Sequence, residues 1–200
     1  MTIVPLERRR LGEAARMLAR AFHEDPTSRS LWPDPRRRPR ALRAFMALPL
    51  ADALGHGHVD AALDGDAIAG VAAWYPAGAY PSDTRRQLRA MPRVLGVAAA
   101  APRAFSRLAR LGLNIDAAFP DDRPSYLAVI GIAPEAQGRG IGSRLIETGL
   151  ARVDGPCYLE TDTEGGMRLY ERHGFEVIER AAQLLPGGPT HWRMLRRAQG

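Results

Sequence analysis

The sequence has 200 residues with 28 basic and 22 acidic side chains, and all 28 basic residues are arginines. Because there is no lysine, chemistry that requires an ε-amino group is excluded, including a pyridoxal Schiff base and a Walker-type phosphate loop. The length suits one domain, and 46% hydrophobic residues are typical of a globular chain. The net charge of +6 suits anionic partners, but no nucleic-acid motif accompanies it, so we predict no nucleic-acid partner.

Cysteine use and hydropathy predict a cytoplasmic protein without a membrane partner. Cys157 is the single cysteine, and one thiol cannot form an intramolecular disulfide. The first ten residues lack the apolar stretch of a signal peptide. The longest uncharged run, residues 67–82, is too short and too interrupted by glycine and proline to span a bilayer.

The first half of the chain predicts helices interrupted by a β-hairpin. Apolar residues recur at helical spacing in three segments, which are residues 5–22, 40–54 and 82–113. Strands are expected at residues 2–4, 58–63 and 67–75, and the Asp-Gly pair between the last two is a hairpin signal. Residues 23–39 are expected to form a loop. Pro92 and Pro102 are expected to divide the long helical segment.

The second half predicts alternating strands and helices. Strands are expected at residues 126–132, 157–161, 175–185 and 191–195, and helices at residues 141–153 and 166–173. Residues 114–124 are expected to form a loop. The first of these strands is continuously apolar, which is typical of a strand buried on both faces. The whole pattern predicts a single α/β (α+β) domain over residues 1–200, with a mixed sheet and helices on both faces.

A glycine-rich turn, QGRGIGS at residues 137–143, follows a predicted strand and opens a predicted helix. Free backbone N–H groups at the positive end of that helix suit a phosphate or pyrophosphate, and Arg139 and Arg144 can add charge. A dinucleotide fingerprint is excluded because Ser143 stands where its third glycine belongs. A Walker loop is excluded because it requires a lysine.

The stretch VIGIAPEAQGRGIGSRLIE resembles the acetyl-CoA loop of the GNAT superfamily of N-acetyltransferases, and YLETDTEGGMRLYERHGFEVIE resembles its second motif. The segments AFHEDP, DGDAIAGVAAWYP and GPTHWRMLR make the chain most similar to puromycin N-acetyltransferase-like bacterial enzymes. The resemblance implies a mostly antiparallel twisted sheet, acetyl-CoA as co-substrate and no metal. It also implies direct acetyl transfer to a small-molecule amine, with a helical and loop insertion over residues 82–122 near the acceptor.

The resemblance further implies roles for individual residues. The CoA arm would bond to the central strand and the pyrophosphate to the turn, through Ile130, Gly131, Ile132, Gln137, Gly138, Arg139, Gly140, Ile141, Gly142, Ser143 and Arg144. Tyr170 matches the tyrosine that donates a proton to the leaving thiolate. Glu160 matches a glutamate that would serve as base or acceptor-site anion. The acceptor site would be shaped by Trp32, Trp74 and Tyr75.

Two departures from the family pattern leave alternatives open. Strand 126–132 has no acidic residue to accept the amine proton, so a water chain is the alternative to Glu160 as base. Gly166 stands where many relatives have an asparagine that contacts the CoA arm. The whole protein is therefore either a small-molecule acetyltransferase, a protein or peptide acetyltransferase, or a non-catalytic acyl-CoA sensor or interaction module. Tyr170 and the intact turn favour an enzyme, which we expect to be a monomer or homodimer and whose donor is acetyl-CoA or another acyl-CoA.

Overall fold

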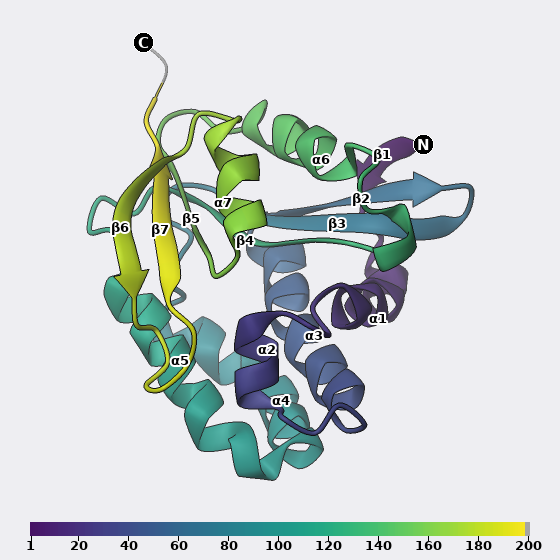
Figure 1. Cartoon of the computed structure of the whole chain (residues 1–200), viewed down its shortest axis with the longest axis vertical. Coiled ribbons are helices and arrows are strands. Elements are labelled where there is room, and N and C mark those ends of the chain that lie inside the picture. Colours follow the sequence, from purple (N-terminus) through teal and green to yellow (C-terminus); the bar gives the residue numbers. More distant parts are fainter. Residues whose placement is uncertain (199–200) are drawn as a thin grey trace.

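A seven-stranded sheet in the order β1-β2-β3-β4-β5-β7-β6 forms the centre of the molecule in the computed structural model, which describes residues 1–198 (Figure 1). Its strands are β1 (Thr2–Pro5), β2 (His58–Asp64), β3 (Ala67–Tyr75), β4 (Ser125–Ile132), β5 (Cys157–Thr161), β6 (Glu176–Ala182) and β7 (His191–Arg196). Strands β4 and β5 are parallel, and the other described pairs are antiparallel. The predicted fold class, a mixed and mostly antiparallel sheet, is therefore confirmed.

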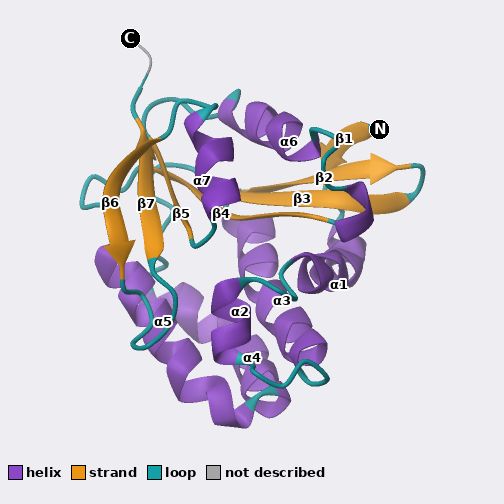
Figure 2. Ribbon diagram, in the orientation of Figure 1, coloured by secondary structure: helices purple, strands orange, loops and turns teal. Residues whose placement is uncertain are grey.

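Helices cover both faces of this sheet (Figure 2). They are α1 (Leu11–Ala21), α2 (Pro26–Leu31), α3 (Arg38–His56), α4 (Thr84–Ala100), α5 (Phe105–Ala118), α6 (Ile141–Leu150) and α7 (Glu164–Glu171). Helix α6 packs on one face of β2, β3 and β4, and α1 and α3 pack on the other. None of the helices in residues 1–198 is both long enough and apolar enough to cross a membrane.

Glycines in the strands let the helices approach the sheet closely. A Cβ atom on Gly131 of β4 would lie 2.6 Å from Leu18 of α1, and one on Gly70 of β3 would lie 3.1 Å from Ile141 and Leu145 of α6. Any larger residue at these positions would push a helix away. Packing density at the centre of the sheet thus depends on these two positions.

Helix α2 lies within residues 23–39, which we expected to be a loop. The sequence carries its start signal, because Asp25 is the N-cap residue and Pro26 occupies the first turn. The backbone N–H of Ser28 donates to Asp25 Oδ1 at 3.2 Å. A six-residue helix is too short for hydrophobic periodicity to reveal it. The expected loop at residues 114–124 is also wrong in part, because α5 continues to Ala118.

The expected break at Pro92 is wrong, because α4 runs through it, just as α3 runs through Pro49. An interior proline removes one backbone hydrogen bond and costs about 3 kcal/mol. In α3, burial of Leu50 and Ala53 against the sheet offsets that cost. The expected break at Pro102 is confirmed, because α4 ends at Ala100 and α5 follows a short turn.

Strand β4 has a paired edge and an edge that is mostly open. Along β3 it pairs from Tyr126 to Ile132, with an irregularity that leaves Ala128 without a partner in the register. Along β5, the described pairing is limited to Ser125 with Cys157 and Tyr126 with Tyr158. Beyond Tyr126 the two strands diverge, and Figure 1 shows β5, β6 and β7 turning away from β1 to β4.

Candidate functional site

A cavity of about 1390 Å³ lies where β4 and β5 diverge. Its walls come from the open edge of β4, the end of β5, the glycine-rich turn, α7, the loop after α1, and helices α2 to α4. Six of the predicted coenzyme-binding residues line it, namely Ile130, Gly131, Ile132, Gln137, Gly138 and Gly142. The cavity thus joins an unpaired strand edge to the start of α6.

The glycine-rich turn has the backbone conformation that its sequence predicts. Gly138 and Gly140 have φ angles of 75° and 74°, the left-handed region that glycine adopts at least cost. A Cβ atom at either position would have no neighbour within 4 Å among the described residues. The N–H groups of Ile141, Gly142 and Ser143 begin α6 and have no carbonyl one turn earlier in the helix. The turn therefore leaves room and donors for a phosphate group.

Three other predicted coenzyme-binding residues of this segment are not part of the cavity lining. Ile141 is buried in the core, where it packs beside Gly70, so only its backbone can serve the site. Arg139 is exposed and its guanidinium is paired with Asp64 Oδ2 at 2.7 Å. Arg144 is exposed on the first turn of α6, where its N–H donates to the carbonyl of Gly140 at 3.2 Å. The charge expected from Arg139 is thus shared with a carboxylate of the β2–β3 turn.

Tyr170 lines the cavity from α7, and its ring packs edge-on against Phe175 with 6.0 Å between centroids. Burial raises the pKa of the Tyr170 hydroxyl above its usual value, and the negative charge of Asp162 raises it further. The hydroxyl therefore carries its proton at neutral pH, as a proton donor must. Asp162 lines the same cavity.

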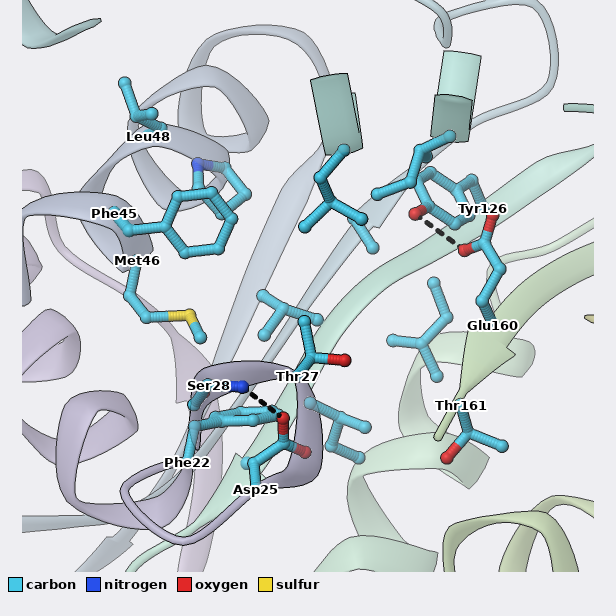
Figure 3. A pocket seen from close by; sticks show the side chains of 18 of the residues that line it. Phe22, Asp25, Thr27, Ser28, Phe45, Met46, Leu48, Tyr126, Glu160 and Thr161 are labelled. Atoms are coloured by element: carbon cyan, nitrogen blue, oxygen red, sulfur yellow. Dashed lines mark hydrogen bonds between the residues drawn. The ribbon is translucent and has the colours of Figure 1, made fainter. Parts of the chain in front are cut away.

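Glu160 stands at the point where β5 leaves β4. Its Oε2 accepts a hydrogen bond from the Tyr126 hydroxyl at 2.9 Å (Figure 3). Its Oε1 is buried and has no hydrogen-bond partner among residues 1–198. Burial raises the pKa of Glu160 to about 7, although the hydroxyls of Tyr126 and Tyr158 and the charge of Arg193 act in the opposite direction.

Trp32 and Tyr75 line the cavity, and their role in shaping an acceptor site stays a prediction. The expectation for Trp74 is wrong. Its ring is fully buried under α6, where a Cβ atom on Gly149 would overlap it. Neighbouring residues of a strand point to opposite faces, so Trp74 and Tyr75 cannot both face the cavity.

Aromatic rings form the floor of the cavity beside Glu160. The ring of Tyr126 lies 6.3 Å from Tyr75, 4.7 Å from Tyr80 and 5.3 Å from Phe119, measured between centroids. Tyr80 precedes α4 and Phe119 follows α5. The predicted insertion at residues 82–122 contributes part of the cavity wall through both α4 and α5.

The sequence analysis missed a pair of carboxyl groups on the opposite wall, Asp25 and Asp162. Asp162 Oδ2 accepts hydrogen bonds from the N–H of Thr27 at 2.9 Å and from its hydroxyl at 2.6 Å. Burial raises the pKa of Asp25 to about 7, and the charge of Asp162 and a hydrogen bond to it add to the shift. The pair therefore holds one proton between two carboxyl groups near neutral pH.

His191 completes this cluster from β7. Its Nε2 lies 3.1 Å from the hydroxyl oxygen of Thr27. Because that hydroxyl gives its proton to Asp162, it accepts from His191, which must carry its proton on Nε2. Burial lowers the pKa of His191, so the ring is neutral at pH 7. The sequence signal that could have revealed Asp25 was the Asp-Pro helix start at residues 25–26.

The structure explains why glycine stands at position 166, where many relatives have an asparagine. A Cβ atom there would lie 2.5 Å from the hydroxyl oxygen of Thr161 and 2.9 Å from that of Thr163. The Thr163 hydroxyl caps α7 by accepting from the N–H of Gly166 at 3.2 Å. An asparagine would therefore displace the cap that begins α7.

Comparison with known proteins agrees with this geometry. The family of the acetyltransferase (GNAT) domain matches residues 108–177, which include β4, the glycine-rich turn, β5 and Tyr170. A mycothiol acetyltransferase from Mycobacteroides abscessus is 40% identical over 64 residues, which cover 28% of this chain and 22% of that protein. The chain thus matches less than a quarter of the length of this relative. The narrower resemblance to puromycin N-acetyltransferase-like enzymes stays a prediction.

Two solved structures are similar over nearly the whole chain. A Corynebacterium glutamicum protein, described as a histone acetyltransferase HPA2 and related acetyltransferase, is 25% identical with a TM-score of 0.73, and the likeness covers 100% of this chain and 97% of that one. A polyamine N-acetyltransferase from Drosophila melanogaster, 18% identical with a TM-score of 0.65 over 98% and 100% of the two chains, shares the fold. The chain is therefore similar to acetyltransferases of the GNAT family over residues 108–177, which include β4, the turn and α7, and it shares its whole fold with solved acetyltransferases.

Proposed function

We propose that the chain transfers the acetyl group of acetyl-CoA directly to an amine of a small molecule. The observation that carries this proposal is the open edge of β4 beyond Tyr126, which connects the glycine-rich turn to a cavity containing Tyr170. Acetyltransferases of the GNAT family use acetyl-CoA as co-substrate. A partly open cavity of about 1390 Å³ between helices and sheet has room for a small acceptor beside the coenzyme.

The residues present fit the coenzyme at two places. The N–H groups of residues 141–143 and the space at Gly138 and Gly140 would hold the pyrophosphate. The unpaired backbone of β4 from Ala128 to Ile132 would bind the amide groups of the pantetheine arm. Gln137 Nε2 donates to the carbonyl of Ile132 at 3.2 Å, which fixes the junction between strand and turn. When bound, the coenzyme supplies an activated acetyl thioester.

The amine must lose a proton and the leaving sulfur must gain one, and the cavity holds a group for each of these two transfers. We assign proton acceptance to the Asp25 and Asp162 pair, because both carboxyl groups line the cavity that Tyr170 lines and because Asp25 has a pKa of about 7. A base with that pKa is half ionised at neutral pH. Tyr170 holds the proton that the leaving sulfur requires. This assignment replaces Glu160 as the candidate base.

The test is thiol release from acetyl-CoA with a panel of amines. We expect release that depends on the amine, and a decrease of about a hundredfold in Tyr170→Phe, because a general acid contributes on the order of 100-fold or more. Thr148→Val is the control. It removes a hydroxyl on α6 that donates to the carbonyl of Arg144 and lies outside the cavity lining, so we expect much less loss of activity.

Other outcomes identify the alternatives. Tight acetyl-CoA binding without release in the presence of any amine would indicate an acyl-CoA sensor or interaction module. Release with peptides but with no small amine would indicate a peptide acetyltransferase. Full activity in Tyr170→Phe would show that the proton donor is a different group.

A further inference from the structure

We propose that the acceptor is a diamine, with one amino group acetylated beside Asp25 and the other held as an ammonium ion by Glu160. This inference rests on the proposed acetyl transfer and specifies its substrate class. It gives Glu160 a binding role in place of a catalytic one. Three features of the cavity carry it.

The first feature is a carboxylate oxygen without a partner. Glu160 lines the cavity, and its Oε1 is buried with no hydrogen-bond partner among residues 1–198. Arg193 is the cation whose charge acts on Glu160, but its three donor nitrogens bond to Tyr158, Glu179 and the carbonyl of Ala118. A buried carboxylate in this state is destabilised until a donor reaches it, and an ammonium ion is the strongest such donor.

The second feature is the aromatic floor around this carboxylate. Tyr75, Tyr80 and Tyr126 all line the cavity. Their ring centroids are between 4.7 and 6.3 Å apart in the three pairs that they form. The faces of aromatic rings attract cations, and rings beside a carboxylate form the type of site that holds alkylammonium groups. A neutral alkyl group would gain only the burial of its apolar surface here, without the attraction between a cation and the ring faces.

The third feature is a second anionic site in the same cavity. Asp25 and Asp162 come from the loop after α1 and the end of β5, and Figure 3 shows Asp25 and Glu160 on separate walls. The amino group that reacts must first lose its proton, and this pair can accept it. A monoamine would occupy this site alone and leave Glu160 without a donor, whereas a diamine satisfies both.

Arginines of the lining support a rival acceptor. Arg86 is engaged by Asp52, at 2.5 Å between Nη2 and Oδ2, but Arg89 and Arg93 are exposed on α4. They would suit an amine with an anionic tail. We favour the diamine because the Glu160 carboxylate is buried where β5 leaves β4, whereas the exposed guanidinium groups of Arg89 and Arg93 are hydrated by solvent.

The experiment compares α,ω-diamines of three to six carbons with monoamines and ω-amino acids of the same length. For the wild-type protein we expect kcat/KM for the best diamine to exceed that of its matched monoamine by about tenfold or more, the effect of one charge-assisted hydrogen bond. A preference for the amino acid would identify the arginine-lined rival and overturn the proposal. Equal rates for diamine and monoamine would overturn it as well, while leaving the proposed acetyl transfer intact.

Glu160→Gln tests the residue itself. We expect the diamine-to-monoamine ratio of kcat/KM to fall to about one. Glu24→Gln is the control, because it removes the same charge from a cavity-lining side chain that is 70% exposed and paired with Arg38, and it should keep the ratio. If Glu160→Gln lowers both substrates equally, Glu160 acts as the base and the proposal fails.

A binding measurement covers the case in which Glu160→Gln does not fold. An N,N-dimethylalkylammonium ion keeps one N–H donor but cannot form a stable amide. In calorimetry it should bind the wild-type protein at least tenfold more tightly than the alcohol of equal length. Equal affinities of the two would contradict the cation site. If neither diamines nor monoamines are acetylated, the proposed function fails, whereas this binding result separately reports on whether the wild-type cavity binds cations.

Discussion

Asp25 and Glu160 are carboxyl groups of similar pKa in different surroundings. Burial raises the pKa of each to about 7. Asp25 is paired with a second carboxyl group, that of Asp162, whereas Glu160 bonds to the hydroxyl of Tyr126. The first arrangement suits proton transfer, and the second suits binding of a cation. Residue chemistry alone would not separate them, because both are acids in one cavity.

Asp25→Asn is expected to stabilise the protein at high pH while lowering its activity. The folded state raises the pKa of Asp25 from 3.8 to about 7, so it favours the protonated form, and wild-type stability decreases as the pH rises across that window. Asparagine carries no charge and still caps α2. The melting temperature of the variant should therefore exceed that of the wild type by a few degrees at pH 8. The difference should vanish near pH 4.

The control for this prediction is Asp64→Asn. The bond to Arg139 lowers the pKa of Asp64, so ionisation of this carboxyl group is favoured in the folded state. Its replacement should give no gain in melting temperature at pH 8. A gain equal to that of Asp25→Asn would mean that net charge, and not the buried pair, controls the pH dependence.

At the scale of elements, the glycine-rich turn gives a test based on charge alone. Gly140 has a φ of 74°, a conformation that asparagine and aspartate both tolerate better than other residues. Gly140→Asp places a negative charge where a pyrophosphate would approach, whereas Gly140→Asn adds the same bulk without charge. We expect CoA to bind at least tenfold more weakly to the Asp variant than to the Asn variant in calorimetry. Equal affinities would place the phosphate elsewhere.

Contact between α6 and β3 gives a stability test. A Cβ atom on Gly149 would overlap the buried ring of Trp74. Gly149→Ala should therefore lower the free energy of unfolding by about 1–3 kcal/mol or more, measured by denaturant titration. Gly96→Ala in α4 is the control, because a Cβ atom there meets nothing within 4 Å in the described structure, and it should be neutral or stabilising. A loss in both variants would contradict the packing argument.

The sequence predicted elements best where they carry long hydrophobic periods or a motif. Strand β4, the turn and α6 lie close to their expected bounds because a buried strand and a glycine-rich helix start are strong local signals. Helix α2 was missed, and with it Asp25, because six residues hold less than two helical turns. The carboxyl pair was unpredictable for a further reason, since Asp25 and Asp162 meet through tertiary contact alone.

At the scale of the molecule, the divergence of β4 and β5 is the feature on which the account depends. It leaves the β4 edge unpaired beyond Tyr126 and makes room for the cavity. The motifs of the sequence predicted the strands on both sides, but the divergence between them belongs to the arrangement of the whole sheet, in which β5 pairs with β7 on its far edge. The residues of β4 and β5 alone do not predict this divergence.

Amide hydrogen exchange with and without CoA tests this central claim most directly. If the coenzyme binds along the open edge, exchange should slow at residues 128–132 and 138–143, where its carbonyl oxygens and phosphates would accept hydrogen bonds from backbone N–H groups. Exchange in the turn between β2 and β3 should remain nearly unchanged. Tight CoA binding with protection confined to other elements, such as α4, would contradict the account.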